Sequence, residues 1–115
     1  MPRLTRFNSL LVVALATCSV GVGVGNASEA TDFFERKIRP VLIEHCYECH
    51  AGDADLIQGG LRLDDPGAMR RGGDSGPALM PGVPDKSLLL AAIRYDGLEM
   101  PPEGPLDPDV ARDFE

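Results

Sequence analysis

The chain has 115 residues, which is enough for one small domain and leaves no room for a second. All 18 acidic residues but only nine of the 11 basic residues lie after position 27, so residues 28–115 carry a net charge of −9. Such a surface repels nucleic acid and anionic membranes, and no basic patch interrupts it. It suits a solvated acidic protein, or one that attracts partners with basic surfaces.

Residues 1–27 have the pattern of an export signal. Arg3 and Arg6 give it a positively charged start. An apolar run follows at Leu10–Val24, and small residues occupy the two cleavage positions, Gly25 and Ala27. The apolar run is short and rich in glycine for a membrane span. We therefore predict a signal peptide over residues 1–27, cleavage before Ser28, and one domain over residues 28–115 in the periplasm or cell envelope. The alternative is an uncleaved membrane anchor.

Cys18 lies inside this segment, in a context that weakly resembles a bacterial lipoprotein box. Lipidation there would tether the chain to a membrane, although Thr17 is a poor residue before such a cysteine. We favour Cys18 as a small apolar residue that leaves with the signal. The exported chain would then contain two cysteines.

The first predicted helix begins at Thr31, whose hydroxyl is suited to an N-cap. Apolar residues then recur at every fourth position, at Phe34, Ile38, Leu42 and Cys46. This spacing predicts an amphipathic helix whose apolar face runs toward Cys46. Pro40 lacks a backbone N–H group, so the sequence also predicts a kink or a restart of the helix near Arg39.

The helix leads into Cys46-Tyr47-Glu48-Cys49-His50, a C-x-x-C-H motif of the kind that attaches haem covalently. Two thiols three residues apart share one face of a helical turn and can reach the two vinyl groups of one porphyrin. The next residue, His50, can then place an imidazole nitrogen on the iron. The motif therefore predicts haem c with Cys46 and Cys49 as attachment points and His50 as the proximal ligand.

Three other interpretations of the motif remain open: a redox dithiol, a structural disulfide, and a zinc site formed by His45, Cys46, Cys49 and His50. Zinc sites usually take their ligands from two separated pairs, and the chain contains no other histidine. Export favours haem, because the thioethers of c-type cytochromes are made outside the cytoplasm.

The rest of the chain reads as short elements separated by glycine and proline. We predict an extended piece at Gly59–Asp64, a short helix at Gly67–Arg71 that glycines end, and a loop over residues 72–84. A helix is expected at Asp85–Tyr95. A final helical segment is expected at Leu106–Phe114, with Asp107 as its cap and Pro108 as its first residue. No series of strands, repeat or nucleotide-binding loop is recognisable.

Four residues are candidates for the distal ligand of the iron: His45, Met69, Met80 and Met100. His45 adjoins Cys46 on the proximal side, and Met69 is expected to pack in a helix. Met80 and Met100 each precede a proline, which stiffens the backbone at the ligand. We favour Met100, which two prolines follow. A thioether ligand raises the potential relative to two histidines.

At this point the residues resemble a known family, the planctomycete-type cytochrome c domain, a branch of the class I cytochrome c-like fold. The resemblance covers roughly residues 32–114. It lies in Ile38-Arg39-Pro40-Val41-Leu42, the haem motif, Gly59-Gly60-Leu61-Arg62-Leu63-Asp64, Gly72-Gly73-Asp74-Ser75-Gly76-Pro77, Pro81-Gly82 with Ser87-Leu88-Leu89, and Glu99-Met100-Pro101-Pro102. By resemblance, Cys46 and Cys49 carry the haem, His50 is proximal and Met100 distal.

The resemblance implies an all-α, cytochrome c-like fold packed around one covalently attached haem. In the family this domain usually forms the N-terminal part of a longer protein, and its last helix extends beyond the point that corresponds to residue 115. We therefore expect a truncated C-terminal helix here, and we expect C-terminal domains absent from this chain as possible partners. We predict a single-electron carrier that serves redox partner proteins. The alternatives are the haem module of a larger multidomain enzyme and a metal-binding module without haem. No catalytic triad or pair of catalytic carboxylates is recognisable in the sequence. We interpret the acidic residues Asp64, Asp65 and Glu99 as helix-capping or solvent-exposed surface residues.

Overall fold

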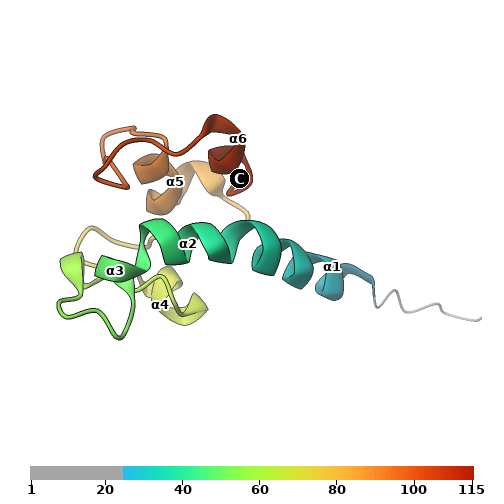
Figure 1. Ribbon diagram of the computed structural model, residues 1–115, viewed down its shortest axis with the longest axis horizontal. Coiled ribbons are helices and arrows are strands. Elements are labelled where there is room, and N and C mark those ends of the chain that lie inside the picture. Colours follow the sequence, from blue (N-terminus) through green and yellow to red (C-terminus); the bar gives the residue numbers. More distant parts are fainter. Residues whose placement is uncertain (1–24) are drawn as a thin grey trace, which may run out of the picture.

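The computed structural model describes residues 25–115, and this part of the chain is helical, with one isolated bridge between Gly73 and Gly76 and no strand (Figure 1). The elements are α1 Gly25–Phe33, the π-helix η1 Phe34–Ile38, α2 Arg39–His45, α3 Tyr47–His50, the 3₁₀ helix η2 Gln58–Gly60, α4 Pro66–Arg71, the 3₁₀ helix η3 Pro84–Lys86, α5 Leu88–Ile93 and α6 Pro108–Arg112. The predicted all-α character is confirmed. Most of the predicted export signal, including Cys18, lies outside the described residues.

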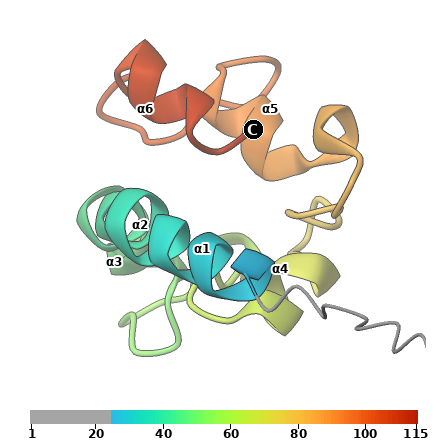
Figure 2. The same ribbon diagram turned by 90° about the vertical axis from the view of Figure 1, so that its right-hand side faces the viewer.

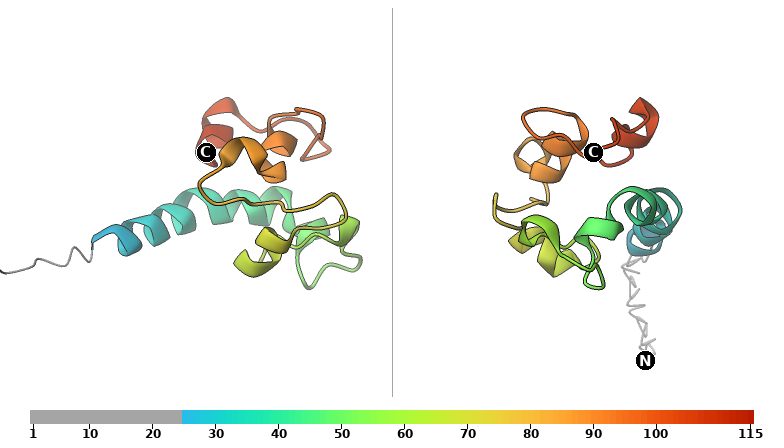
Figure 3. Two further views of the ribbon diagram at one scale, coloured as in Figure 1. Left: turned by 180° about the vertical axis from the view of Figure 1, so that it is seen from behind. Right: turned by 60° about the vertical axis from the view of Figure 1, so that its left-hand side comes forward.

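The helices form two layers. One layer contains the continuous run of α1, η1 and α2 together with α3 and α4, and the other contains α5 and α6 (Figure 2). The left panel of Figure 3 shows the two layers from behind the view of Figure 1, with α1 (blue) extending beyond them. None of the helices in the described part of the chain is long and apolar enough to cross a membrane.

The long first helix changes its winding immediately before Pro40. The Arg39 N–H group donates to the Phe34 carbonyl oxygen, a spacing of five residues, and α2 then begins with Pro40 in its first turn. π-Helical turns are rare and occur mostly as single turns inside α-helices, at points where the regular hydrogen-bond ladder is interrupted. Of the predicted kink or restart near Arg39, the restart is confirmed, because a π-helical turn ends at Ile38 and α2 begins at Arg39.

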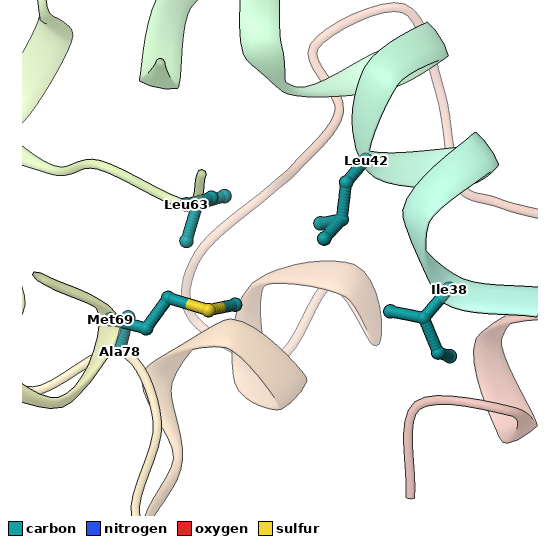
Figure 4. Packing of buried hydrophobic residues seen from close by; sticks show 5 residues of the cluster. All are labelled: Ile38, Leu42, Leu63, Met69 and Ala78. Atoms are coloured by element: carbon teal, nitrogen blue, oxygen red, sulfur yellow. The ribbon is translucent and has the colours of Figure 1, made fainter. Parts of the chain in front are cut away.

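The core lies between this helix and the chain that follows the C-x-x-C-H motif. Its buried members are Ile38, Leu42, Leu63, Met69 and Ala78 (Figure 4). Leu42 is fully buried, and burying a leucine side chain stabilises a fold by about 1.5–3 kcal/mol. The expectation that Met69 packs in the interior is also confirmed.

Two predicted helix starts and one stop are confirmed by their hydrogen bonds. Asp65 Oδ1 accepts from the Ala68 N–H group at 2.6 Å at the start of α4, and Gly72 follows its end at φ +74°. Asp107 Oδ1 accepts from the Asp109 N–H group at 2.8 Å at the start of α6. However, α6 ends at Arg112, short of the predicted Phe114.

Three local predictions are wrong. Thr31 is no N-cap, because the helix already begins at Gly25, and the Thr31 hydroxyl donates to the Ala27 carbonyl oxygen inside it. The predicted helix over residues 85–95 is broken at Ser87, which is extended because its Oγ accepts from the Met80 N–H group at 2.9 Å. Residues 59 and 60 form a turn instead of an extended piece, since both have positive φ.

The end of the chain returns to the first helix and to α5. Asp113 pairs with Lys37 at 3.6 Å, Glu115 pairs with Arg94 at 2.8 Å, and Phe114 packs against the core. The first and last helical segments are therefore in contact.

Gly72 allows a backbone approach that no other residue permits. A Cβ atom at this position would lie 1.8 Å from the Gly76 carbonyl oxygen and 2.6 Å from Pro77 Cα. Its φ of +74° and ψ of −162° also belong to a region reached essentially by glycine alone. Residues 72–77 therefore form a closed loop only because residue 72 has no side chain.

We predict that Gly72→Ala lowers the free energy of unfolding by more than about 3 kcal/mol, because it adds a clash to the cost of the backbone conformation. Gly82→Ala is the matched control, since Gly82 has φ +77° but nothing within 4 Å of the added Cβ. The control should lose only about 1–2 kcal/mol. Denaturant unfolding followed by circular dichroism measures both, and equal losses would contradict the steric argument.

Candidate functional site

A cavity of about 550 Å³ lies between the two layers. Its lining comes from the C-x-x-C-H motif, from residues 58–63 and 73–78, and from the second layer at residues 88–93 and 98–106. The four residues predicted to hold haem all contribute to it, namely Cys46, Cys49, His50 and Met100. The fold therefore brings the predicted attachment points and both predicted ligands to one space.

The two cysteines reach the cavity because the helix breaks at the first of them. The Cys46 N–H group completes α2 by donating to the Leu42 carbonyl oxygen at 2.9 Å, but Cys46 has φ −129°, outside the helical region. Its own carbonyl oxygen then accepts from His50 N at 2.9 Å, which starts the separate turn α3. One short turn therefore presents Cys46, Cys49 and His50 together.

The Cys46 thiol differs from the attacking thiol of a redox dithiol. Both cysteines are free, so the structure contains no disulfide between them, contrary to the structural-disulfide alternative. Burial raises the pKa of the Cys46 thiol to about 11, whereas reactive dithiols have lowered pKa values. Gln58 Nε2 donates to Cys49 Sγ at 3.6 Å.

The imidazole of His50 is oriented by a backbone carbonyl. His50 Nδ1 lies 3.2 Å from the Leu61 carbonyl oxygen, and a carbonyl can only accept, so the geometry assigns the proton to Nδ1. Nε2 then has a free lone pair for a metal. This arrangement is the usual one for metal-ligating histidines, whose second nitrogen donates to a fixed acceptor.

The four zinc ligands considered from the sequence do not form a cluster. Within the described residues, no group of three or more His, Cys, Asp or Glu side chains is placed to hold a metal ion. His45 lies at the edge of the cavity with its Nε2 3.8 Å from Glu44 Oε2, and it is exposed.

Asp64 fixes the chain just after His50. Its carboxylate accepts from the Gly52 N–H group at 2.9 Å and from two nitrogens of Arg62 at 3.0 Å each. These hydrogen bonds lower the pKa of Asp64 to about 2, and those from Arg62 have the largest effect. From the sequence, Asp64 was expected to be a cap or a solvated surface residue, and these hydrogen bonds were not predicted. The Arg62-x-Asp64 spacing was the available signal.

Two glycine-containing segments that line the cavity pack directly on each other. The Asp74 N–H group donates to the Gly59 carbonyl oxygen at 2.8 Å. A Cβ atom on Gly73 would lie 2.2 Å from that same oxygen, so the two backbones touch. Both segments belong to the motifs of the resemblance, but nothing local in the sequence shows that they pack on each other.

The methionine candidates lie in three different environments. Met100 lines the cavity and is 42% exposed, Met80 is 37% exposed and does not line it, and Met69 is buried in the core. Met100 precedes Pro101 through a cis peptide bond, and its N–H group donates to the Ala92 carbonyl oxygen at 3.1 Å. Of the three thioethers, only that of Met100 belongs to the same cavity as His50.

The charged residues that line the cavity are of one sign. They are Glu44, Glu48, Asp74 and Glu103, and we call them the acidic rim. No lysine or arginine lines this cavity. The sequence predicted an acidic surface overall, but the concentration of carboxylates at the cavity was not foreseeable from composition.

The cavity and its donor groups fit a haem. Its volume lies within the roughly 300–1,000 Å³ of ordinary ligand pockets, and leucine, isoleucine, alanine and proline side chains supply much of the lining. Two thiols and an oriented imidazole come from one layer, and a thioether comes from the other. This set of donors matches covalent attachment with mixed histidine and methionine ligation.

Comparison with known proteins agrees with this site. The family model described as Planctomycete cytochrome C matches residues 46–104, slightly more than half of the chain. The match begins at the first cysteine of the C-x-x-C-H motif and includes Met100. No curated protein and no solved structure matches the chain significantly.

Proposed function

Because the chain belongs to the planctomycete cytochrome c family, we propose that it is an exported carrier of single electrons that holds one covalently attached haem c. The observation that carries the proposal is the cavity between the layers, which collects Cys46, Cys49, His50 and Met100. Cytochrome c domains are electron carriers and are generally not enzymes.

Each of these residues has a distinct part in the proposal. Cys46 and Cys49 would bind the porphyrin edge through thioethers, while His50, held through its Nδ1 proton by Leu61, would offer Nε2 to the iron. Met100 would be the second ligand, and a thioether favours the reduced state relative to a second imidazole. When bound, the haem supplies the one-electron exchange itself.

The surrounding chain would control access to the site. Leu61, Leu63, Leu89 and Ile93 line the cavity and would help to exclude water from a bound haem. Lower polarity around a redox centre disfavours the state with the greater net charge, which for a haem is the ferric state, so these apolar residues would raise the potential.

We also propose that electrons are exchanged with proteins that present basic surfaces. The acidic rim and the net charge of −9 over residues 28–115 support this, because opposite charges speed diffusional encounter. The export signal at residues 1–27 would place both partners in the periplasm or cell envelope.

The first prediction from the proposed function concerns attachment and export together. The intact mass of the protein recovered from the periplasm should equal residues 28–115 plus one haem, and acid–organic extraction should not release the haem. Cys46→Ala or Cys49→Ala should leave one thioether and sharply lower the yield of haem-loaded protein. Free extraction of the haem would refute covalent attachment, and a mass starting at a lipidated Cys18 would refute the cleavage site.

The second prediction separates the two exposed methionines. Met100→Ala should abolish the methionine-to-iron charge-transfer band and lower the potential on the order of 0.1 V, within the roughly 0.8 V that axial ligands span. Met80→Ala is the control, since Met80 is similarly exposed but lies outside the cavity lining. Absorption spectra of the ferric protein measure the charge-transfer band, and redox titration measures the potential. Loss of the band in the Met80 variant alone would refute Met100 as the ligand.

The third prediction concerns the acidic rim. Reduction of hexaammineruthenium(III), a cationic probe, should slow as salt is added, whereas reduction of ferricyanide should accelerate. Glu103→Gln should slow the reaction with the cationic probe roughly twofold at low salt. Glu29→Gln, which removes the same charge from α1, should have little effect. Identical salt dependence for the two probes would argue against the proposed steering.

A further inference from the structure

Tyr95 has a backbone conformation that bulky residues avoid. Its φ is +59°, and it is the only residue other than glycine with positive φ in the described part of the chain. Aromatic residues rarely occupy this region, where glycine and asparagine are the usual choices. Gly97, two residues later, has φ +78° at no steric cost. A disfavoured conformation at Tyr95 persists because the surrounding contacts determine it, and such outliers cluster at functional sites.

A hydrogen bond from the Tyr95 side chain helps to hold this backbone conformation. The hydroxyl donates a hydrogen bond to the carbonyl oxygen of Pro101, the residue that follows Met100. Tyr95 is half-buried and Pro101 is buried, although Met100 and Pro102 are exposed. The tyrosine therefore connects the end of α5 with the middle of the loop that carries the methionine.

A second connection holds the same loop from its other side. The Met100 N–H group donates to the Ala92 carbonyl oxygen at 3.1 Å, and the Tyr95 N–H group donates to that oxygen at the same distance. Ala92 is buried in α5. The peptide before Met100 and the peptide after Pro101 are thus both anchored, and the proline ring fixes one of the torsions between them. Little backbone freedom remains at Met100 itself.

We propose that Tyr95 is the positioning residue for Met100, holding the loop so that the thioether faces the cavity. The inference rests on the proposed function, in which Met100 is the distal ligand. Tyr95 itself does not line the cavity, so it acts through the loop and not on the cofactor. Its hydroxyl shifts the balance between the sulfur held at the iron and the sulfur released from it.

Tyr95→Phe tests this, because it removes the hydroxyl and keeps the ring. Imidazole is the probe, since it replaces a weakly held methionine at ferric haem. One hydrogen bond is worth about 0.5–1.5 kcal/mol, so the apparent dissociation constant of imidazole should fall about 3- to 10-fold. Thr31→Val is the matched control, because it removes a hydroxyl that also donates to a backbone carbonyl, but in α1. Imidazole binding equal to wild type in Tyr95→Phe would overturn the proposal.

Two further measurements separate positioning from general destabilisation. In the Met100→Ala background, Tyr95→Phe should no longer alter imidazole binding, because no sulfur competes; a persisting effect would show that Tyr95 acts by another route. Hydrogen exchange at the Met100 amide should accelerate about 3- to 10-fold in Tyr95→Phe, and an unchanged rate would also refute the anchor. This exchange measurement remains decisive if wild-type protein attaches no haem, a result that would refute the proposed function instead.

Discussion

The fold is built around a cavity in the position where a domain of this size normally has its core. A cavity of about 550 Å³ lies between the layer of α2 and α3 and the layer of α5. The cluster of buried core residues beside it has five members. A small chain with so little buried apolar surface has a narrow margin of stability. A cofactor that filled the cavity would add the missing contacts, and binding to the folded state alone would stabilise it. Folding and loading with haem are therefore expected to depend on each other.

Hydrogen bonds and close backbone contacts replace much of the missing side-chain packing. The turn at Gly59 rests directly on Gly73, the Gly72 loop closes on Gly76, and Asp64 ties the backbone after His50 to Arg62. Such contacts occupy little volume, so they can border a large cavity without filling it. They also tolerate substitution poorly, because any Cβ at Gly72 or Gly73 would meet backbone atoms less than 2.5 Å away.

The two proposed ligands are held by different means. His50 lies in the short helical turn α3, which follows the break of the first helix at Cys46, and the Leu61 carbonyl oxygen fixes its ring. Met100 lies in a loop of the other layer, and its position depends on the Ala92 carbonyl oxygen and on the Tyr95 hydroxyl. Loop segments open more readily than helices that contribute to a core. The methionine side of the site is therefore the one at which small changes in sequence would most easily tune the potential.

The sequence by itself determined the features that depend on neighbouring residues. The C-x-x-C-H motif, the caps at Asp65 and Asp107, and the irregularity before Pro40 are all local, because their partners lie within a turn or two. The tertiary structure alone decided which methionine shares a cavity with His50, why Ser87 breaks the predicted helix, and which carboxylates surround the cavity. Those outcomes depend on contacts between distant segments, such as Gly59 with Asp74 or Leu61 with His50. Local spacing carries no information about such pairs, since only the packing of the two layers brings them together.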